Sequence, residues 1–186
     1  ALQANRKELE HLARHDVLTG LPNRRAFQER LELTLVRAQR SAERFALLFI
    51  DVDNFKGIND HWGHDGGDAA LKIVALRLSA ATRKADAVAR MGGDEFVVLL
   101  ENPSHREDIV NIAEKLLESV RAPILHDGNE MQVGFSIGIS QYPDDGNTAA
   151  QLLSRADHAM YEIKAAGRNG FRFSSTKDVS TNPASG

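Results

Sequence analysis

The sequence predicts an α+β fold with a mixed central β-sheet flanked by helices. Residues Phe45–Ile50 form a continuous apolar run, which is typical of a strand buried on both faces. Gly92 and Gly93 lie between two strand-like segments, which predicts an antiparallel hairpin because glycine adopts positive φ angles without a steric penalty. Segments with the period of amphipathic helices alternate with the strands. The hairpin makes the sheet mixed, and the helices should flank it.

Three further segments have the character of strands. Asp86–Met91 and Phe96–Leu100 are the two arms of the expected hairpin. In Met131–Ser140, apolar residues alternate with small or polar ones, which is the period of a strand with two different faces. The small-residue face, which includes Gly134 and Gly138, should allow a helix or a ligand to approach closely.

Capping signals mark the start of four expected helices, each with apolar residues at helical spacing. The first should run from Asn23 to about Glu43, and the last should end near Gly167. The other starts are indicated by Asp68 as an N-cap and by the capping-box patterns of Ser104 with Glu107 and Thr148 with Gln151.

The two ends of the chain differ from the middle. Leu9 and Leu12 are at heptad-like positions in a segment rich in helix formers, although the segment is shorter than two heptads. Residues 1–15 are therefore either an amphipathic stub that frays or part of a truncated signalling helix. Residues 174–186 are rich in Ser, Thr, Asn, Pro and Gly, which predicts a disordered tail. The folded domain should span residues 16–173.

The composition narrows the class of protein. A chain of 186 residues suits one domain with a sizeable core. A net charge of -3 and a pI of about 6.2 give no reason to expect binding to nucleic acid or to a membrane surface. The absence of cysteine excludes disulfides and thiolate metal sites and fits a reducing compartment. No apolar run approaches a membrane span and no signal peptide is visible, so a soluble chain is expected.

Two acidic clusters at the ends of strand-like segments are the main functional candidates. Asp51 and Asp53 follow the buried run, and Asp94 and Glu95 follow the glycine pair. Open sheets of α/β type bind ligands beyond the carboxyl ends of their strands. Carboxylates with backbone carbonyls suit Mg²⁺, usually beside substrate phosphates. Each cluster alone could be an ordinary turn or cap, but the two together, each beside basic residues, favour a phosphate and metal site.

Several short motifs share one order along the chain and cover it from about Asp16 to Phe173. The motifs are Asp16–Arg24 (DVLTGLPNR), Asp51–Lys56 (DVDNFK) followed by Asn59-Asp60, Gly63–Asp68 (GHDGGD), Gly92–Phe96 (GGDEF), Ser136–Ile139 (SIGI), and Ala156-Asp157 with Met160-Tyr161, Lys164 and Gly167–Asn169. Together they are highly specific. The chain resembles the GGDEF domains of the bacterial diguanylate cyclase family.

The resemblance implies a nucleotidyl-cyclase-like fold with a ferredoxin-like palm. It also implies that two GTP molecules condense to cyclic di-GMP with release of pyrophosphate, in a homodimer whose domains face each other. The implied cofactor is Mg²⁺ or Mn²⁺, held by the Asp51 carboxylate, the Val52 carbonyl and Asp94. Asp94 and Glu95 are the implied catalytic residues, with Glu95 either assisting the metal or accepting the proton.

The resemblance also implies a GTP site. Its phosphate-binding residues would be Lys56, Lys164 and Arg168, with the backbone around Asn54, Phe55, Gly92 and Gly93. Asn59 and Asp68 match the pair that reads guanine, and adenine would leave such buried groups unpaired. For the lysines the alternative is solvated surface charge, and for Asp68 it is the helix cap. His61, Trp62 and His64 match no catalytic position and should be structural.

A second, regulatory site is implied by Arg83-Lys84-Ala85-Asp86, which is separated from Gly92 by five residues. At this offset the family carries a product-inhibition motif, so Arg83 and Asp86 should bind cyclic di-GMP away from the active site, and Arg90 should belong either to this inhibitory site or to the active site. The alternative is that Arg83 and Lys84 are ordinary partners of a helix C-terminus.

The implied partners are GTP, cyclic di-GMP, a second copy of the chain and an upstream sensor domain, without nucleic acid or direct membrane contact. The implied location is the cytoplasm, in a parent protein that could be membrane-anchored. Two other functions stay open: a module that senses GTP or cyclic di-GMP without turnover, and a dimerisation or regulatory partner of a phosphodiesterase domain.

Overall fold

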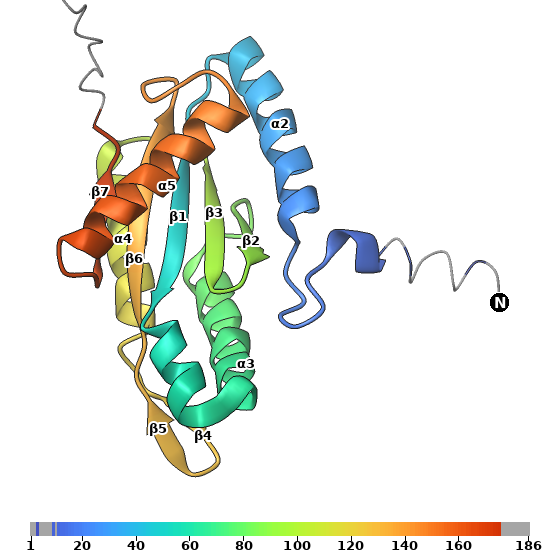
Figure 1. Cartoon of the computed structure of the whole chain (residues 1–186). Coiled ribbons are helices and arrows are strands. Elements are labelled where there is room, and N and C mark those ends of the chain that lie inside the picture. Colours follow the sequence, from blue (N-terminus) through green and yellow to red (C-terminus); the bar gives the residue numbers. More distant parts are fainter. Residues whose placement is uncertain (1–2, 4–8, 10, 176–186) are drawn as a thin grey trace, which may run out of the picture.

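The computed structural model describes residues 3, 9 and 11–175 (Figure 1). The helices are α2 (Arg24–Ser41), α3 (Phe55–Ala81), α4 (Arg106–Ser119) and α5 (Ala149–Ala165). The strands are β1 (Phe45–Asp53), β2 (Ala87–Gly92), β3 (Glu95–Glu101), β4 (Ile124–His126), β5 (Asn129–Met131), β6 (Gly134–Tyr142) and β7 (Gly170–Phe173).

Five strands form one mixed sheet in the order β2-β3-β1-β6-β7, and β4 pairs with β5 in a separate hairpin. All neighbours in the large sheet are antiparallel except β6 and β7, which are parallel. Helices α2 and α5 cover one face of this sheet, while α3 and α4 cover the other (Figure 1). The predicted α+β fold, with a mixed central sheet flanked by helices, is confirmed.

The central strand β1 is buried along its whole length because helices cover both sides of it. Leu47 and Phe49 pack in the cluster formed with α2 and α5, and Leu48 and Ile50 pack in the cluster formed with α3 and α4. This alternation follows from the two-residue period of a strand. It also decides which layer the acidic residues at the end of β1 face.

The predicted hairpin of β2 and β3 is confirmed, with a shift of its turn. Gly92 and Gly93 both have positive φ angles, 139° and 50°. However, Gly92 pairs with Glu95 after an irregularity in β2, so the two turn residues are Gly93 and Asp94 rather than the two glycines. The shift places the Asp94 carboxylate in the turn itself.

The segment predicted as one strand from Met131 to Ser140 is divided. Met131 ends β5 of the small hairpin, and β6 starts at Gly134. The small-residue face behaves as predicted, because a Cβ atom added to Gly138 would collide with the backbone of Ala156 and Met160 in α5. The parallel edge strand β7 was not predicted.

Three of the helix starts agree with the capping signals to within two residues. The Asn23 side chain caps α2 by accepting from the Ala26 amide at 3.0 Å, and Thr148 caps α5 by accepting from the Gln151 amide at 3.2 Å. The capping box of α4 lies one residue later than predicted, at His105 and Asp108.

The predicted start of a helix at Asp68 is wrong, because α3 begins at Phe55 and Asp68 lies within it. The helix is kinked at Gly63, whose φ of 72° and ψ of 177° are not helical. On either side of the kink the turns pack closely, since a Cβ atom on Gly67 would collide with the Asn59 side chain. Gly67 therefore serves helix packing, despite the low intrinsic helix propensity of glycine.

The expected N-terminal stub and C-terminal tail lie largely outside the described residues. Residues 3, 9 and 11–14 are helical, and nothing is described for the rest of residues 1–10 or for residues 176–186. Among the helices that are described, none is both long and apolar enough to cross a membrane.

Candidate active site

Strand β1 carries two buried carboxylates to the end of the central strand. Asp51 and Asp53 are 4% and 7% exposed, and both face the layer that contains α5. The Lys164 ammonium, in the last turn of α5, donates to Asp51 at 2.7 Å. This ion pair joins the central strand to α5 at the candidate site.

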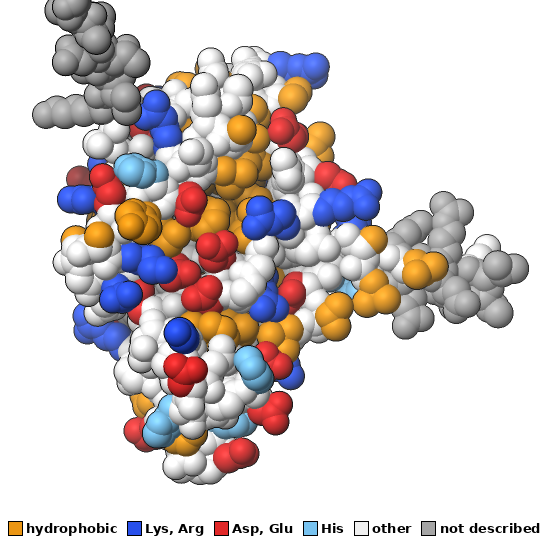
Figure 2. All heavy atoms as spheres, viewed as in Figure 1, with side chains coloured by type: hydrophobic (Ala, Val, Ile, Leu, Met, Phe, Trp, Pro, Cys, Tyr) orange, Lys and Arg blue, Asp and Glu red, His pale blue; other side chains and the backbone are white. Residues whose placement is uncertain are grey.

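The β2–β3 turn brings the second acidic cluster to the same place. The Val52 amide donates to the Asp94 carbonyl at 3.1 Å, and Glu95 lies opposite Asp51 in the strand register. The two acidic clusters, which are far apart in the sequence, therefore converge as predicted. In Figure 2, acidic side chains gather below α5 with Lys and Arg side chains beside them.

Burial and neighbouring acids raise the pKa of two of these carboxylates, Asp51 and Glu95. Burial raises the pKa of Asp51, and the neighbouring Asp94 raises it further, while Lys164 acts in the opposite direction. Burial also raises the pKa of Glu95, together with Asp157, Asp51 and Asp94. Two acids that hold protons more tightly than usual, beside a lysine, are typical of a site that receives additional positive charge.

A cavity of about 400 Å³ opens at this point, and eight of the predicted residues line it. They are Asp51, Val52, Asn54, Phe55, Lys56, Asp94, Lys164 and Arg168. Larger hollows of about 640 and 810 Å³ lie beside α2 and between α3 and α4. Cavity volume alone therefore does not identify the site. This cavity is distinguished by two carboxylates that lie together with three basic side chains.

The start of α3 adds backbone donors to the cavity. Asn54 precedes the helix in a left-handed conformation (φ 59°) and makes no side-chain cap hydrogen bond. The first amide groups of a helix lack partners within the helix and carry partial positive charge, so they suit an anion. Lys56 lies in this first turn. A polyphosphate would find backbone and side-chain donors here.

The residues predicted to read guanine lie around the kink of α3 and outside the cavity lining. The Asn59 side chain lies against Gly67, the neighbour of Asp68, and Asp68 is exposed. The kink thus brings Asn59 close to the turn that carries Asp68. Their reading of guanine stays a prediction.

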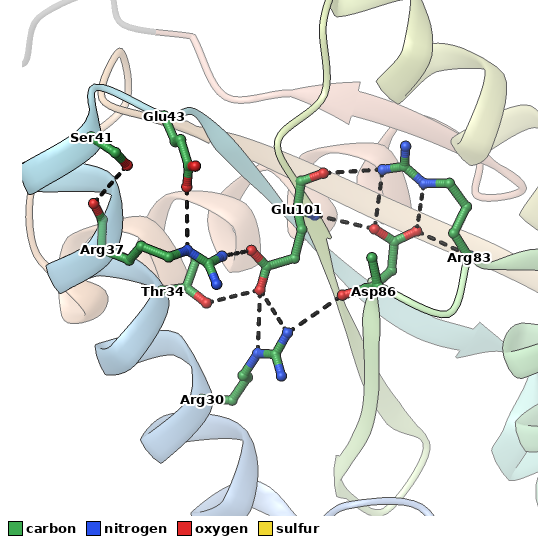
Figure 3. Close-up of polar contacts among 9 residues, drawn as sticks. Arg30, Thr34, Arg37, Ser41, Glu43, Arg83, Asp86 and Glu101 are labelled. Atoms are coloured by element: carbon green, nitrogen blue, oxygen red, sulfur yellow. Dashed lines mark hydrogen bonds and ion pairs between the residues drawn. The ribbon is translucent and has the colours of Figure 1, made fainter.

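At the other end of the β2–β3 hairpin, Arg83 and Asp86 form a close pair (Figure 3). The Arg83 guanidinium donates to both Asp86 oxygens at 3.1 and 3.2 Å, and the Glu101 amide donates to Asp86 at 3.1 Å. Arg83 also donates to the Glu101 carbonyl at 3.1 Å. The Asp86 side chain is fully buried, whereas that of Arg83 is 53% exposed. A ligand would therefore meet Arg83 first.

Arg90 lies apart from Arg83 and Asp86, so the first of its two predicted places, the inhibitory site, does not agree with the structure. It lies near the turn, where it donates to the Gly93 carbonyl at 2.7 Å and to Asp16 at 3.1 Å. Arg83 and Arg90 occupy opposite ends of the strand pair because an extended strand separates them. Arg90 instead connects the Asp16 motif to the hairpin that carries Asp94.

The Glu101 carboxylate, 9% exposed, links α2 to the Arg83–Asp86 pair, a role that no sequence motif indicated. It accepts from Arg30 at 2.9 Å, from Thr34 at 3.0 Å and from Arg37, all on α2 (Figure 3). The main chain of the same residue bonds both Arg83 and Asp86. Glu101 thus contacts both α2, through its side chain, and the Arg83–Asp86 pair, through its main chain.

Glu101→Ala should lower the free energy of unfolding by about 2–3 kcal/mol, since it removes hydrogen bonds from two guanidinium groups to one buried acceptor. Urea unfolding followed by circular dichroism would measure this. Glu43→Ala is the matched control, because Glu43 is a more exposed partner of Arg37 and should contribute less than about 1 kcal/mol. Equal losses in the two variants would contradict a special role for Glu101.

The strand order and the helices on both faces define an α+β domain whose cavity, at the end of the central strand, is lined by carboxylates and basic side chains. A family model described as "Diguanylate cyclase, GGDEF domain" matches residues 13–170. The chain belongs to this family of diguanylate cyclase domains, as its motifs predicted.

Two relatives from Pseudomonas aeruginosa illustrate the similarity. The bifunctional diguanylate cyclase/cyclic di-GMP phosphodiesterase MucR is 47% identical over 171 residues, which cover 92% of this chain and 25% of MucR. A solved structure of an N-terminally truncated TpbB (YfiN) that comprises only the GGDEF domain is 44% identical with a TM-score of 0.84, covering 87% of this chain and 94% of that one.

A structure of the coiled coil and GGDEF domain of DgcB from Caulobacter crescentus, in complex with c-di-GMP, has a TM-score of 0.84 at 26% identity. The alignment covers 92% of this chain and 91% of that one. The chain spans about a quarter of the length of MucR, so full-length relatives contain more than this domain.

Proposed function

We propose that the domain condenses two molecules of GTP into cyclic di-GMP between two facing copies of the chain. Each 3′-hydroxyl oxygen bonds to the α-phosphorus of the other GTP, each α-phosphorus releases pyrophosphate, and each hydroxyl loses its proton. The observation that carries this proposal is the convergence of Asp51 and Asp94 with Lys56, Lys164 and Arg168 around one cavity. A cavity of about 400 Å³ suits one nucleotide, so the second comes from the partner copy.

The residues at the site fit a divalent cation. Two carboxylates, Asp51 and Asp94, and the Val52 carbonyl are hard oxygen donors, the set that Mg²⁺ takes together with substrate phosphates and water. The Lys164 ammonium, 2.7 Å from an Asp51 oxygen, neutralises part of this negative charge. When bound, Mg²⁺ or Mn²⁺ would neutralise the triphosphate and increase the acidity of the attacking hydroxyl.

The chain's own groups bind and orient the nucleotide. Lys56, Lys164 and Arg168 bind the β- and γ-phosphates together with the first amides of α3. Asn59 and Asp68 read the guanine edge, while Glu95, whose pKa is raised by burial and by neighbouring acids, assists the metal or accepts the proton.

Incubation of the purified chain with GTP and Mg²⁺ should yield cyclic di-GMP, identified by chromatography and mass spectrometry. A second sample, dimerised through a fused N-terminal leucine zipper, should turn over faster, because facing copies are needed. If the dimerised sample binds GTP but forms no cyclic product, the domain is a nucleotide-sensing module instead.

We also propose that the product inhibits the enzyme at Arg83 and Asp86. Arg83→Ala should raise the concentration of cyclic di-GMP that gives half inhibition by about tenfold or more, because an exposed guanidinium that binds phosphate or guanine is lost. Initial rates should change little. Lys84→Ala is the neighbouring control and should keep wild-type inhibition. If Arg83→Ala is inhibited as strongly as the wild type, the product binds elsewhere.

A further inference from the structure

The Asp53 carboxylate makes two hydrogen bonds that the proposed chemistry does not use. It is 7% exposed and accepts from the Ser136 hydroxyl of β6 at 2.6 Å and from the Asn169 amide at 2.8 Å. Ser136 is fully buried. One buried carboxylate therefore joins the end of β1 to β6 and to the turn after α5.

That turn has an unusual backbone. Gly167, Arg168 and Asn169 have φ angles of 121°, 63° and 49°, so three consecutive residues lie in the region that only glycine adopts readily. Such a conformation persists only where its surroundings enforce it. Two hydrogen bonds do so here, from the Arg168 amide to the Ile163 carbonyl at 2.9 Å and from the Asn169 amide to Asp53.

The turn determines where Arg168 points. Arg168 lines the cavity with Asp51, Asp94 and Lys164, whereas Asp53 does not. The contact between Asp53 and Asn169, the residue after Arg168, is tightly packed. A Cβ atom on Gly134 would lie 3.2 Å from an Asp53 oxygen and 3.3 Å from the Asn169 side chain. Loss of the Asp53 bond would free the turn to relax toward ordinary φ angles and to withdraw the guanidinium.

We propose that Asp53 is a positioning residue for phosphate binding: by holding the Asn169 amide, it fixes the turn that presents Arg168 to the β- and γ-phosphates of GTP. Asp53 touches neither substrate nor reacting atoms and acts only through Arg168. The inference rests on the proposed role of Arg168 in binding phosphate.

The test is a double-mutant cycle on the binding of a non-hydrolysable GTP analogue with Mg²⁺, measured by calorimetry. Arg168→Ala should weaken binding by about tenfold or more, and Asp53→Ala by a similar factor. In the Arg168→Ala background, Asp53→Ala should change the affinity by less than about twofold, because the group it positions is already absent.

Two further variants separate positioning from general support of the fold. Asp53→Asn should bind within about twofold of the wild type, because its carbonyl still accepts from the Asn169 amide and the Ser136 hydroxyl can accept from the new amino group. Ser136→Ala should also keep its affinity, since it leaves the bond to Asn169 intact. If Asp53→Ala does not fold, Gly134→Ala crowds the same contact and should weaken binding only when Arg168 is present.

The outcomes are distinguishable. Equal weakening by Asp53→Ala in both backgrounds would overturn the positioning role. If Arg168→Ala itself leaves the affinity unchanged, the proposed phosphate role of Arg168 fails, whatever Asp53 does.

Discussion

Asp51→Asn should lower the rate of cyclic di-GMP formation by about 10³-fold or more while the domain still folds. Asp51 is 4% exposed and lines the cavity with Asp94 and Lys164. An asparagine of the same shape keeps the packing but removes the negative charge that a divalent cation requires. Lys164 loses its ion pair but, at 33% exposure, it can still be solvated, so the fold should survive.

The assay is the rate of product formation at saturating GTP and Mg²⁺, with far-UV circular dichroism to verify folding. Asp144→Asn is the control, because Asp144 pairs with Arg44 on the surface, away from the cavity, and should keep its rate within about twofold. Asp94→Ala should be as damaging as Asp51→Asn. Turnover retained by a folded Asp51→Asn variant would show that this carboxylate does not hold the cation.

The convergence of the acids could be predicted because local signals specify it. An apolar run buried on both faces, followed by Asp51, marks the end of a central strand, and a glycine-rich hairpin marks Asp94. Strand β1 then pairs directly with β3, so Asp51 and Glu95 become neighbours. Short-range patterns and one strand pairing are sufficient for this part of the site.

The start of α3 could not be predicted in the same way. Asp68 is a good N-cap by residue type, and the glycines before it argue against a helix. In the structure these glycines allow two helical segments to pack around the kink at Gly63. Packing between the two helical segments outweighs the low helix propensity of the glycines. The propensities of single residues do not include the energy of such packing.

Residues whose roles depend on distant contacts were also missed. Asp53 meets an amide 116 positions away in the sequence, and Glu101 meets Arg30 across 71 positions. The resemblance placed Arg90 either with Arg83 or at the active site, and an extended strand carries the two arginines to opposite ends of a hairpin. Residues that are close in sequence are in contact in a turn, but they lie far apart along an extended strand.

Neutralising Asp51 and Glu95 together, as Asp51→Asn and Glu95→Gln, should stabilise the metal-free domain at neutral pH. Burial and neighbouring acids raise the pKa of both groups in the folded state. Each therefore binds its proton more tightly when folded, so its contribution to stability is greatest at low pH. That contribution falls as pH rises from about 4, the ordinary value, through the raised folded values. The double variant should lack this decline, which urea unfolding at several pH values would measure.

A divalent cation with a GTP analogue should reverse the loss of stability that rising pH causes in the wild type. A ligand at about 100 times its dissociation constant adds about 2.7 kcal/mol of stability by mass action. The gain should shrink on acidification, because protons compete with the cation for Asp51. The double variant should gain far less at any pH, since it has lost the charge that attracts the ion. If wild type and variant are stabilised equally, the nucleotide binds without help from these carboxylates, and the acid cluster is not the metal site.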